Sequence, residues 1–319
     1  MQKDFTLYYS SWSQYRSCPQ SLLWGKGWYS IDLGGGLGHK KPLPVKKSEH
    51  HMVMGIAIQA AVEGFYNLWN LLDPATLKDR LLELGEESFH LEISRKYIDW
   101  RVAPTQDEMR QVIKDGILGY MRTLKHHHLL GVWNKAELDL VGYLDKYNPV
   151  GGRPDVVIRR DDDPCKGITI IDGKNGKRYS DGKGGQMTYT DPDQLRWYAM
   201  MFYICYKVLP DRLGFCYYRY PYGSPILDQN GNPTGDVEDG VEWISCTMED
   251  IKELAHKAVE ARRAMEKEKF DATPDPKKCR LCDYETVCPQ RQEQKAANRR
   301  TPKADDLLGG AQGFTKLSM

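Results

Sequence analysis

The sequence lacks long hydrophobic runs. Its 319 residues contain no apolar stretch of the length, about 18 residues, that a membrane-spanning helix requires. The first residues, MQKDFTLYYSSWSQY, have no apolar core of the kind found in signal peptides, and no internal repeat is evident. We therefore expect a cytoplasmic protein that has no membrane partner and no repeat architecture.

The sequence also has little net charge. Its 45 lysines and arginines nearly balance 44 aspartates and glutamates, which leaves +1. This excludes a polycation that binds nucleic acid through its overall charge, so such affinity must come from local basic patches. Three segments qualify, at 39–47, 174–183 and 291–303. The last lies in the polar stretch 291–319, which we predict to be a flexible basic tail.

Two carboxylates and an amine stand on segments with strand character. Asp155 precedes the apolar run VVI, and Asp172 and Lys174 end the β-branched run ITII. Asp172 and Lys174 are two residues apart, so they face the same side of a strand. The turn-rich link RRDDDPCKG predicts a hairpin that brings Asp155 beside Asp172. Asp145 is an alternative partner, but Asp155 allows the simpler hairpin.

Two neighbouring carboxylates repel each other unless a proton or a cation lies between them. Oxygen ligands with few sulfurs or imidazoles nearby favour Mg²⁺ or Mn²⁺. Such an ion next to the ammonium of Lys174 is typical of phosphate chemistry. Each fragment alone is common on protein surfaces, and only the combination on neighbouring strands indicates a site.

The pattern PD followed by DGK resembles the PD-(D/E)XK nuclease superfamily, and the flanking motifs resemble its RecB-like branch, which includes CRISPR-associated iron-sulfur exonucleases. The resemblance extends from about Tyr8 to Pro289. It implies an α/β fold with a restriction-endonuclease-like core, a mixed sheet flanked by helices, and helical insertions. The implied activity is metal-dependent hydrolysis of phosphodiester bonds by an exonuclease that acts on single-stranded DNA or DNA ends.

The resemblance also assigns residues outside the two strands. The segment GIAIQAAVE places Gly55, Gln59 and Glu63 at four-residue steps, which puts them on one face of a helix. Glu63 would join Asp155 and Asp172 as a metal ligand. Gln59 stands where the branch has a metal-binding histidine, and this weaker ligand favours Mg²⁺ over Mn²⁺. His50 or His51 could compensate only if the chain folds back.

A second helix motif follows the strands. In TDPDQLRWYAMMFY, Asp191 is an N-cap candidate, and Gln194 and Tyr198 lie one turn apart as in the Q-x-x-x-Y motif of the branch. The resemblance implies that Gln194 steadies the attacking water or the phosphate and that Tyr198 lines the DNA channel. An ordinary amphipathic helix would also explain the segment.

The cysteines give a further signal. Cys279, Cys282 and Cys288 lie close together in CRLCDYETVCP, and three thiols need a fourth ligand, for which Cys18 is the best candidate. In the resembling family, four such cysteines hold a 4Fe-4S cluster that clamps the two chain ends together. Zinc is the less favoured occupant. The clamp predicts a single nuclease domain over residues 1–290.

The histidine triplet His126 to His128 is a poor metal site, because three successive residues diverge around a helix, and we expect a charged helix end. Other functions remain open: an endonuclease, a non-catalytic nucleic-acid-binding scaffold of the same fold, or an iron-sulfur redox protein. Recombination or repair proteins are possible partners. Helices are expected at 11–24, 48–72, 74–88, 105–129 and 248–270 and in the segment that contains Gln194. Strands are expected at 133–148, 152–159, 167–175, 212–220 and 241–245.

Overall fold

The computed structural model describes residues 5–26, 47–175, 179–180, 186–187, 190–228, 231–275, 278–279 and 282–300. The chain forms two compact units. The core unit comprises Gln2–Trp12 and Lys47–Glu266, and the terminal unit comprises Met1, Ser13–Lys46 and Lys267–Met319. The single nuclease domain expected over residues 1–290 stays a prediction.

The core unit is built on a five-stranded mixed sheet in the order β12-β9-β6-β5-β2. Its strands are β2 (Trp133–Ala136), β5 (Val156–Arg159), β6 (Ile168–Lys174), β9 (Arg212–Tyr217) and β12 (Val241–Ile244). β5 and β6 form the predicted antiparallel hairpin, whereas β6 and β9 run parallel. Parallel neighbours need a crossover, and α6 (Pro192–Tyr206) provides it.

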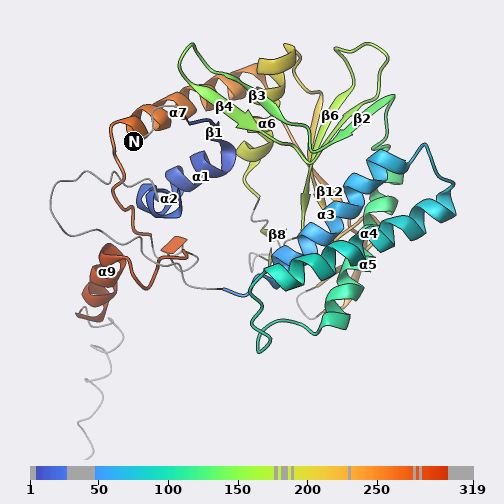
Figure 1. The fold of residues 1–319 in the computed structure, drawn as a ribbon, viewed down its shortest axis with the longest axis horizontal. Helices are drawn as coiled ribbons and strands as arrows, with labels where there is room; N and C mark the ends of the chain where they lie inside the picture. Colours follow the sequence, from blue (N-terminus) through green and yellow to red (C-terminus); the bar gives the residue numbers. More distant parts are fainter. Residues whose placement is uncertain are drawn as a thin grey trace, which may run out of the picture. The chain divides into compact units, whose positions relative to one another are not determined.

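Helices cover this sheet on both faces. α3 (His50–Leu68), α4 (Pro74–Arg95) and α5 (Gln106–His127) pack side by side, as Figure 1 shows in blue to green. They share one hydrophobic core with Val156, Ile158 and Ile171 of the sheet. α6 packs against β6 and β9 and against α7 (Met248–Glu266). Because both faces are covered, the first three residues of β5 and the first five of β6 are all buried instead of alternating.

Smaller sheets complete the core unit. β1 (Leu7–Tyr8), β4 (Pro149–Gly152) and β3 (Leu140–Tyr143) form a three-stranded sheet in the order β1-β4-β3. β10 (Pro225–Leu227) pairs with β11 (Pro233–Val237), and β7 (Tyr179–Ser180) pairs with β8 (Gln186–Met187). The mixed α/β architecture agrees with the predicted fold class. No helix among the described residues is long and apolar enough to cross a membrane.

Several element boundaries differ from those predicted. The expected helix 11–24 is two helices, α1 (Tyr9–Ser17) and α2 (Pro19–Lys26), because Pro19 starts a new one. The strand expected at 133–148 is divided into β2 and β3 by Glu137, whose φ of 49° ends β2. The strand expected at 152–159 begins only at Val156, where β5 starts. Pro154 separates β5 from β4, because proline has no backbone N–H to donate to a neighbouring strand.

The terminal unit joins the two chain ends. Tyr15 Oη donates to the Lys269 carbonyl (2.8 Å), Thr273 Oγ1 donates to the Ser17 carbonyl (3.0 Å), and Trp24 packs edge-on against Tyr284. These contacts hold segments more than 250 residues apart in one unit.

The predicted tail begins as a helix. α9 (Pro289–Arg300) contains Arg291 and Lys295, both of which form ion pairs with Glu285 (3.2 and 3.1 Å). Up to Arg300 the predicted tail is thus helical, because these ion pairs and the proline start support a helix. Residues 301–319 lie outside the described part of the chain, as do 39–46 of the first basic patch and most of the second.

Candidate active site

Three carboxylates lie in one row across the central sheet. The pairs Ala136–Val156 and Val156–Ile171 set the register of β2, β5 and β6. One step further along these strands, Glu137 stands opposite Asp155, and Asp155 stands opposite Asp172. Directly opposite residues of antiparallel strands have neighbouring Cβ atoms on the same face. The register therefore gathers three acidic side chains at the same end of strands β2, β5 and β6. We call these three residues the acidic row.

Asp172 is held by the helix and strand beside it. Only 3% of the residue is exposed, its Oδ2 atom is ion-paired with Lys174, and its Oδ1 atom accepts from Gln194 Nε2 (2.9 Å). Lys174 Nζ in turn donates to Gln194 Oε1 (2.8 Å), so the three side chains close a ring. Asp172 and Lys174 point the same way, as the period-two pattern of the strand predicts. Burial raises the pKa of Asp172, and Lys174 opposes this shift.

Asp155 depends on the hairpin for its position. Its Oδ2 atom accepts from the backbone amide of Gly173 (2.7 Å), which lies between the two residues of the D-G-K motif. Burial and the neighbouring Asp172 raise the pKa of Asp155 well above its usual range. The rival Asp145 lies instead in the exposed turn between β3 and β4, where it accepts from Tyr147 N and Asn148 Nδ2. The structure thus brings Asp155, and not Asp145, to Asp172.

Glu137 is a site residue that sequence reasoning missed. It is not glycine, yet its φ is 49°, a left-handed conformation that glutamate seldom adopts. Its amide donates to the Asp155 carbonyl (2.9 Å), and burial raises the pKa of its carboxyl. Backbone strain of this kind costs about 1–3 kcal/mol and gathers at functional sites. The segment AELD carries no recognisable motif, and only the pairing of β2 with β5 brings Glu137 to Asp155.

The face of α3 that carries Gln59 and Glu63 lies against the acidic row. Gln59 Nε2 donates to Glu137 Oε1 (3.1 Å), and Gln59 Oε1 accepts from Tyr218 Oη (2.6 Å). The amide of Gln59 therefore positions Glu137, and its oxygen is already engaged. Burial and Glu137 raise the pKa of Glu63, which places its carboxyl next to that of Glu137.

The start of α3 meets the end of β6. Asn175 Nδ2 donates to the His51 carbonyl (2.9 Å), and Asn175 also lies against Gly55. His50 Nδ1 is hydrogen-bonded to Ser48 Oγ (2.9 Å). The contact between α3 and the end of β6 thus involves the backbone carbonyl of His51.

Tyr198 lies one turn from Gln194 on α6, and its hydroxyl accepts from Gln194 Nε2 (3.2 Å). Burial raises the pKa of Tyr198, and the Asp172 carboxylate adds to this effect. Asp191 caps the helix through Asp193 N (3.1 Å), as expected. The α6 motif therefore packs into the core and also reaches the acidic row.

These features can be compared with known families. The model of the PD-(D/E)XK nuclease superfamily matches residues 9–289, which is most of the chain. The chain belongs to the PD-(D/E)XK nuclease superfamily. Among curated proteins, none matches the chain significantly. Members of this superfamily are generally hydrolases of nucleic-acid phosphodiester bonds and typically use a divalent metal ion.

The residues of this PD-(D/E)XK protein fit such an ion. Glu137 and Asp155 bring acidic groups whose pKa values are raised by burial, and Asp172 lies beside them. Asp172 Oδ2 is buried and accepts no hydrogen bond from the described residues apart from its ion pair with Lys174. A divalent cation would relieve the repulsion among the carboxylates and use the free lone pairs.

The four predicted cluster cysteines all belong to the terminal unit. Burial raises the pKa of Cys282, and Cys18 and Cys279 add smaller effects, so these thiols are neighbours. Cys288 Sγ lies 3.7 Å from Gln20 Oε1, next to the Cys18 segment. The geometry gathers the cysteines but does not by itself show a cluster.

The D-G-K motif needs its glycine. A Cβ atom on Gly173 would overlap the hydroxyl of Tyr218, which is buried and hydrogen-bonded to Gln59. We predict that Gly173→Ala lowers the free energy of unfolding by about 1–3 kcal/mol through overpacking. The midpoint of urea unfolding checks this. Gly55→Ala is the control, because its Cβ meets Asn175 at 3.4 Å and helix propensity favours alanine. Equal midpoints for Gly173→Ala and wild type would contradict the prediction.

The acidic row should cost stability when no metal is bound. The pKa of Asp155 is higher in the folded than in the unfolded protein, so between the two values the native state binds more protons and stability falls as pH rises. In chelator at pH 7 we expect Asp155→Asn to be more stable than wild type by about 1 kcal/mol. This difference in the free energy of unfolding should shrink at lower pH, where the Asp155 carboxyl of the wild type becomes protonated.

Denaturant unfolding at several pH values measures this difference. Asp163→Asn is the control, since the Cys165 amide lowers the pKa of this exposed carboxyl and its loss should bring no gain. A destabilised Asp155→Asn variant at pH 7 would show that the carboxylate repulsion does not dominate.

Proposed function

We propose that the protein is a metal-dependent deoxyribonuclease that hydrolyses phosphodiester bonds, working from ends on single-stranded DNA. The observation that carries this is the row Glu137, Asp155 and Asp172, with Lys174 paired to Asp172, in a chain of the PD-(D/E)XK superfamily. Acidic side chains at the edge of a sheet together with one ammonium suit in-line attack on a phosphate.

Asp155 and Asp172 would hold a Mg²⁺ or Mn²⁺ ion, with Glu63 and Glu137 completing the acidic surroundings. Such an ion, when bound, polarises a phosphoryl oxygen and lowers the pKa of a bound water. Lys174 offsets the negative charge that develops on the phosphate in the transition state. Gln194 keeps Lys174 and Asp172 in place through its amide, and Tyr198 supports Gln194. Gln59 orients Glu137 and in this protein is a positioning residue more than a ligand.

The preference for ends and single strands follows from the resemblance of GIAIQAAVE and QLRWY to motifs of the RecB-like branch. Exonucleases of that branch also carry the four-cysteine pattern that Cys18, Cys279, Cys282 and Cys288 repeat. The alternatives are an endonuclease with the same centre and a non-catalytic scaffold of this fold. Circular and linear substrates separate them.

Nuclease activity is tested with end-labelled linear single-stranded DNA in Mg²⁺ or Mn²⁺. We expect wild type to release nucleotides, and Lys174→Ala and Asp172→Asn to be slower by at least about 100-fold, because each removes charge from the transition-state environment. Lys166→Ala is the matched control, since Lys166 is exposed and pairs with Asp163 in the loop between β5 and β6 (3.2 Å).

A circular single strand of the same length completes the test. An exonuclease leaves it intact, whereas cutting of the circle would show the endonuclease. If no substrate is degraded with either metal, or if Lys174→Ala is as active as wild type, the enzymatic proposal fails and the scaffold remains.

We also propose that Cys18, Cys279, Cys282 and Cys288 hold a 4Fe-4S cluster in the terminal unit, with zinc as the alternative. Protein purified without oxygen should contain about four irons per chain and absorb visible light, and Cys282→Ser should lose both. Cys165→Ser is the control, because Cys165 is exposed in a loop of the core unit. Stoichiometric zinc without iron would favour the zinc site, and absence of both metals would reject either occupant.

A further inference from the structure

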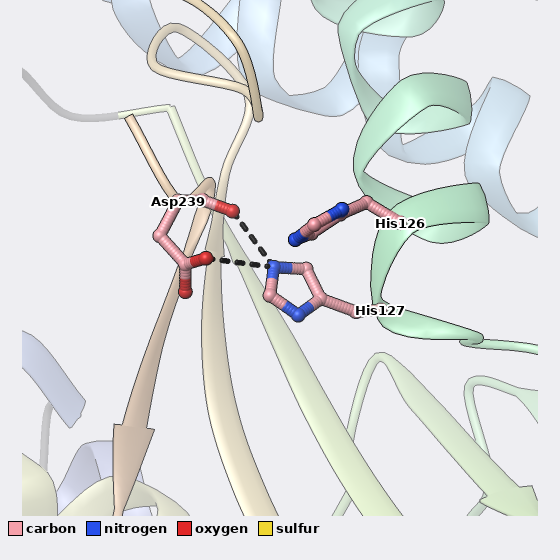
Figure 2. A group of neighbouring side chains, drawn as sticks. All are labelled: His126, His127 and Asp239. Atoms are coloured by element: carbon pink, nitrogen blue, oxygen red, sulfur yellow. Dashed lines mark hydrogen bonds and ion pairs between the residues drawn. The ribbon is translucent and has the colours of Figure 1, made fainter. Parts of the chain in front are cut away.

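The end of α5 brings together groups that the sequence suggested would diverge. His128 takes a left-handed conformation (φ 52°) that ends the helix just after His126 and His127. Candidate ligand atoms of His126, His127 and Asp239 all lie within 4.8 Å of one another. Figure 2 shows both rings facing the side chain of Asp239, which lies in the loop before β12. The expectation that these histidines form a poor metal site considered the helix alone and did not include Asp239.

We propose that His126, His127 and Asp239 form a second metal site, for a divalent transition ion of the Zn²⁺, Co²⁺ or Ni²⁺ class. Two imidazoles and a carboxylate are the ligand types that these ions prefer, whereas Mg²⁺ prefers an all-oxygen site. The negative end of the α5 dipole also favours a cation at this position. Three protein ligands leave further coordination positions to water.

The ligands are held in place before any ion binds. The His126 ring stacks on Tyr222 with centroids 3.5 Å apart and planes 10° apart. Tyr222 N donates to Thr123 Oγ1 (2.9 Å), which ties the stacking partner to α5 itself. His127 is largely buried, with 9% of its side chain exposed, and packs edge-on against Trp243. Two imidazoles with fixed positions lose little conformational entropy on binding.

Asp239 is fixed from the other side. Its carbonyl oxygen lies 2.7 Å and its Oδ1 atom 3.4 Å from His127 Nε2. The next residue, Gly240, has a φ of 79°, and a Cβ atom there would press on Tyr222 N and Thr123. The loop can therefore approach α5 this closely only with glycine at position 240. Without an ion, His127 Nε2–H donates to the Asp239 carbonyl; with an ion, this proton resides on Nδ1 and Nε2 offers its lone pair.

One positive side chain lies beside the site. Arg212 stacks over Trp243 with its guanidinium carbon 3.6 Å from the ring centroid, and its charge interacts with Asp239. The carboxylate is thus shared between Arg212 and the proposed ion. This sharing favours a weaker, exchangeable site over a permanently occupied one, because a positive neighbour disfavours a second cation.

The site would connect α5 to the base of an exposed arm. β10 and β11 form this arm, every residue of β11 is exposed, and the arm closes through Gly223 N to Glu238 O (3.0 Å) and Glu238 N to Ser224 O (2.7 Å). Asp239 directly follows that closure. An ion shared by α5 and Asp239 would stabilise the attachment of the arm to the helix.

The test adds Zn²⁺ to metal-depleted, full-length protein that carries no histidine tag, and measures stoichiometry by calorimetry and the thermal midpoint. Wild type should bind one equivalent more than His126→Ala or Asp239→Asn, and its midpoint should rise by about 2 °C or more beyond theirs. Asp172→Asn should keep this equivalent, because it alters only the acidic row. His90→Ala is the matched control, since His90 also faces a carboxylate, Glu86 (2.9 Å), but on α4.

The proposal is overturned if His126→Ala and Asp239→Asn bind as many Zn²⁺ ions as wild type with the same affinity. His126 and Asp239 are exposed, so both variants should fold, and circular dichroism without metal verifies this. Co²⁺ provides a second readout, because a histidine-ligated ion has a visible spectrum that Asp239→Asn should change. DNA hydrolysis enters neither measurement, so failure of this proposal is distinct from failure of the nuclease proposal.

Discussion

Repulsion among neighbouring carboxylates is the constraint on which the candidate active site depends. Asp172 is buried, Glu137 and Asp155 are partly buried beside it, and burial raises the pKa of each. Such a row is unfavourable unless a cation or protons neutralise it. Its persistence therefore requires a scaffold strong enough to hold the groups in place, and this requirement explains the structure around them.

The scaffold supplies a separate restraint for each acid. Gln194 and Lys174 hold Asp172, the Gly173 amide holds Asp155, and Gln59 holds Glu137. Two of these restraints come from α6 and α3, which are far apart in sequence and pack on the sheet, and the others come from β6 within the sheet. Tyr218 links two of them, because it donates to Gln59 while its ring covers Gly173. The strained backbone at Glu137 is stabilised by the same packing.

Much of this could be predicted from local sequence. The alternation of strand side chains placed Asp172 and Lys174 on one face, and the short polar link between two apolar runs predicted the β5–β6 hairpin. The Asp191 cap and Pro192 predicted the start of α6. Each of these inferences rests on interactions within a few residues. Glu137 escaped notice because the pairing of β2 with β5 depends on the whole sheet, and α9 escaped because its ion pairs with Glu285 are invisible in composition.

The sequence by itself determined the chemical groups and their local geometry: the D-G-K triad, the four-residue steps on α3, and the clustered thiols. Only the tertiary structure decided which groups meet. It places Asp155 and not Asp145 beside Asp172, and it places Gln59 where its amide donates a hydrogen bond to Glu137. It also brings Asp239 close to the histidines that end α5. The physical reason is that strand register and helix docking are set by burial of the shared core, to which residues throughout the chain contribute, whereas side-chain direction within one element follows from its own backbone period.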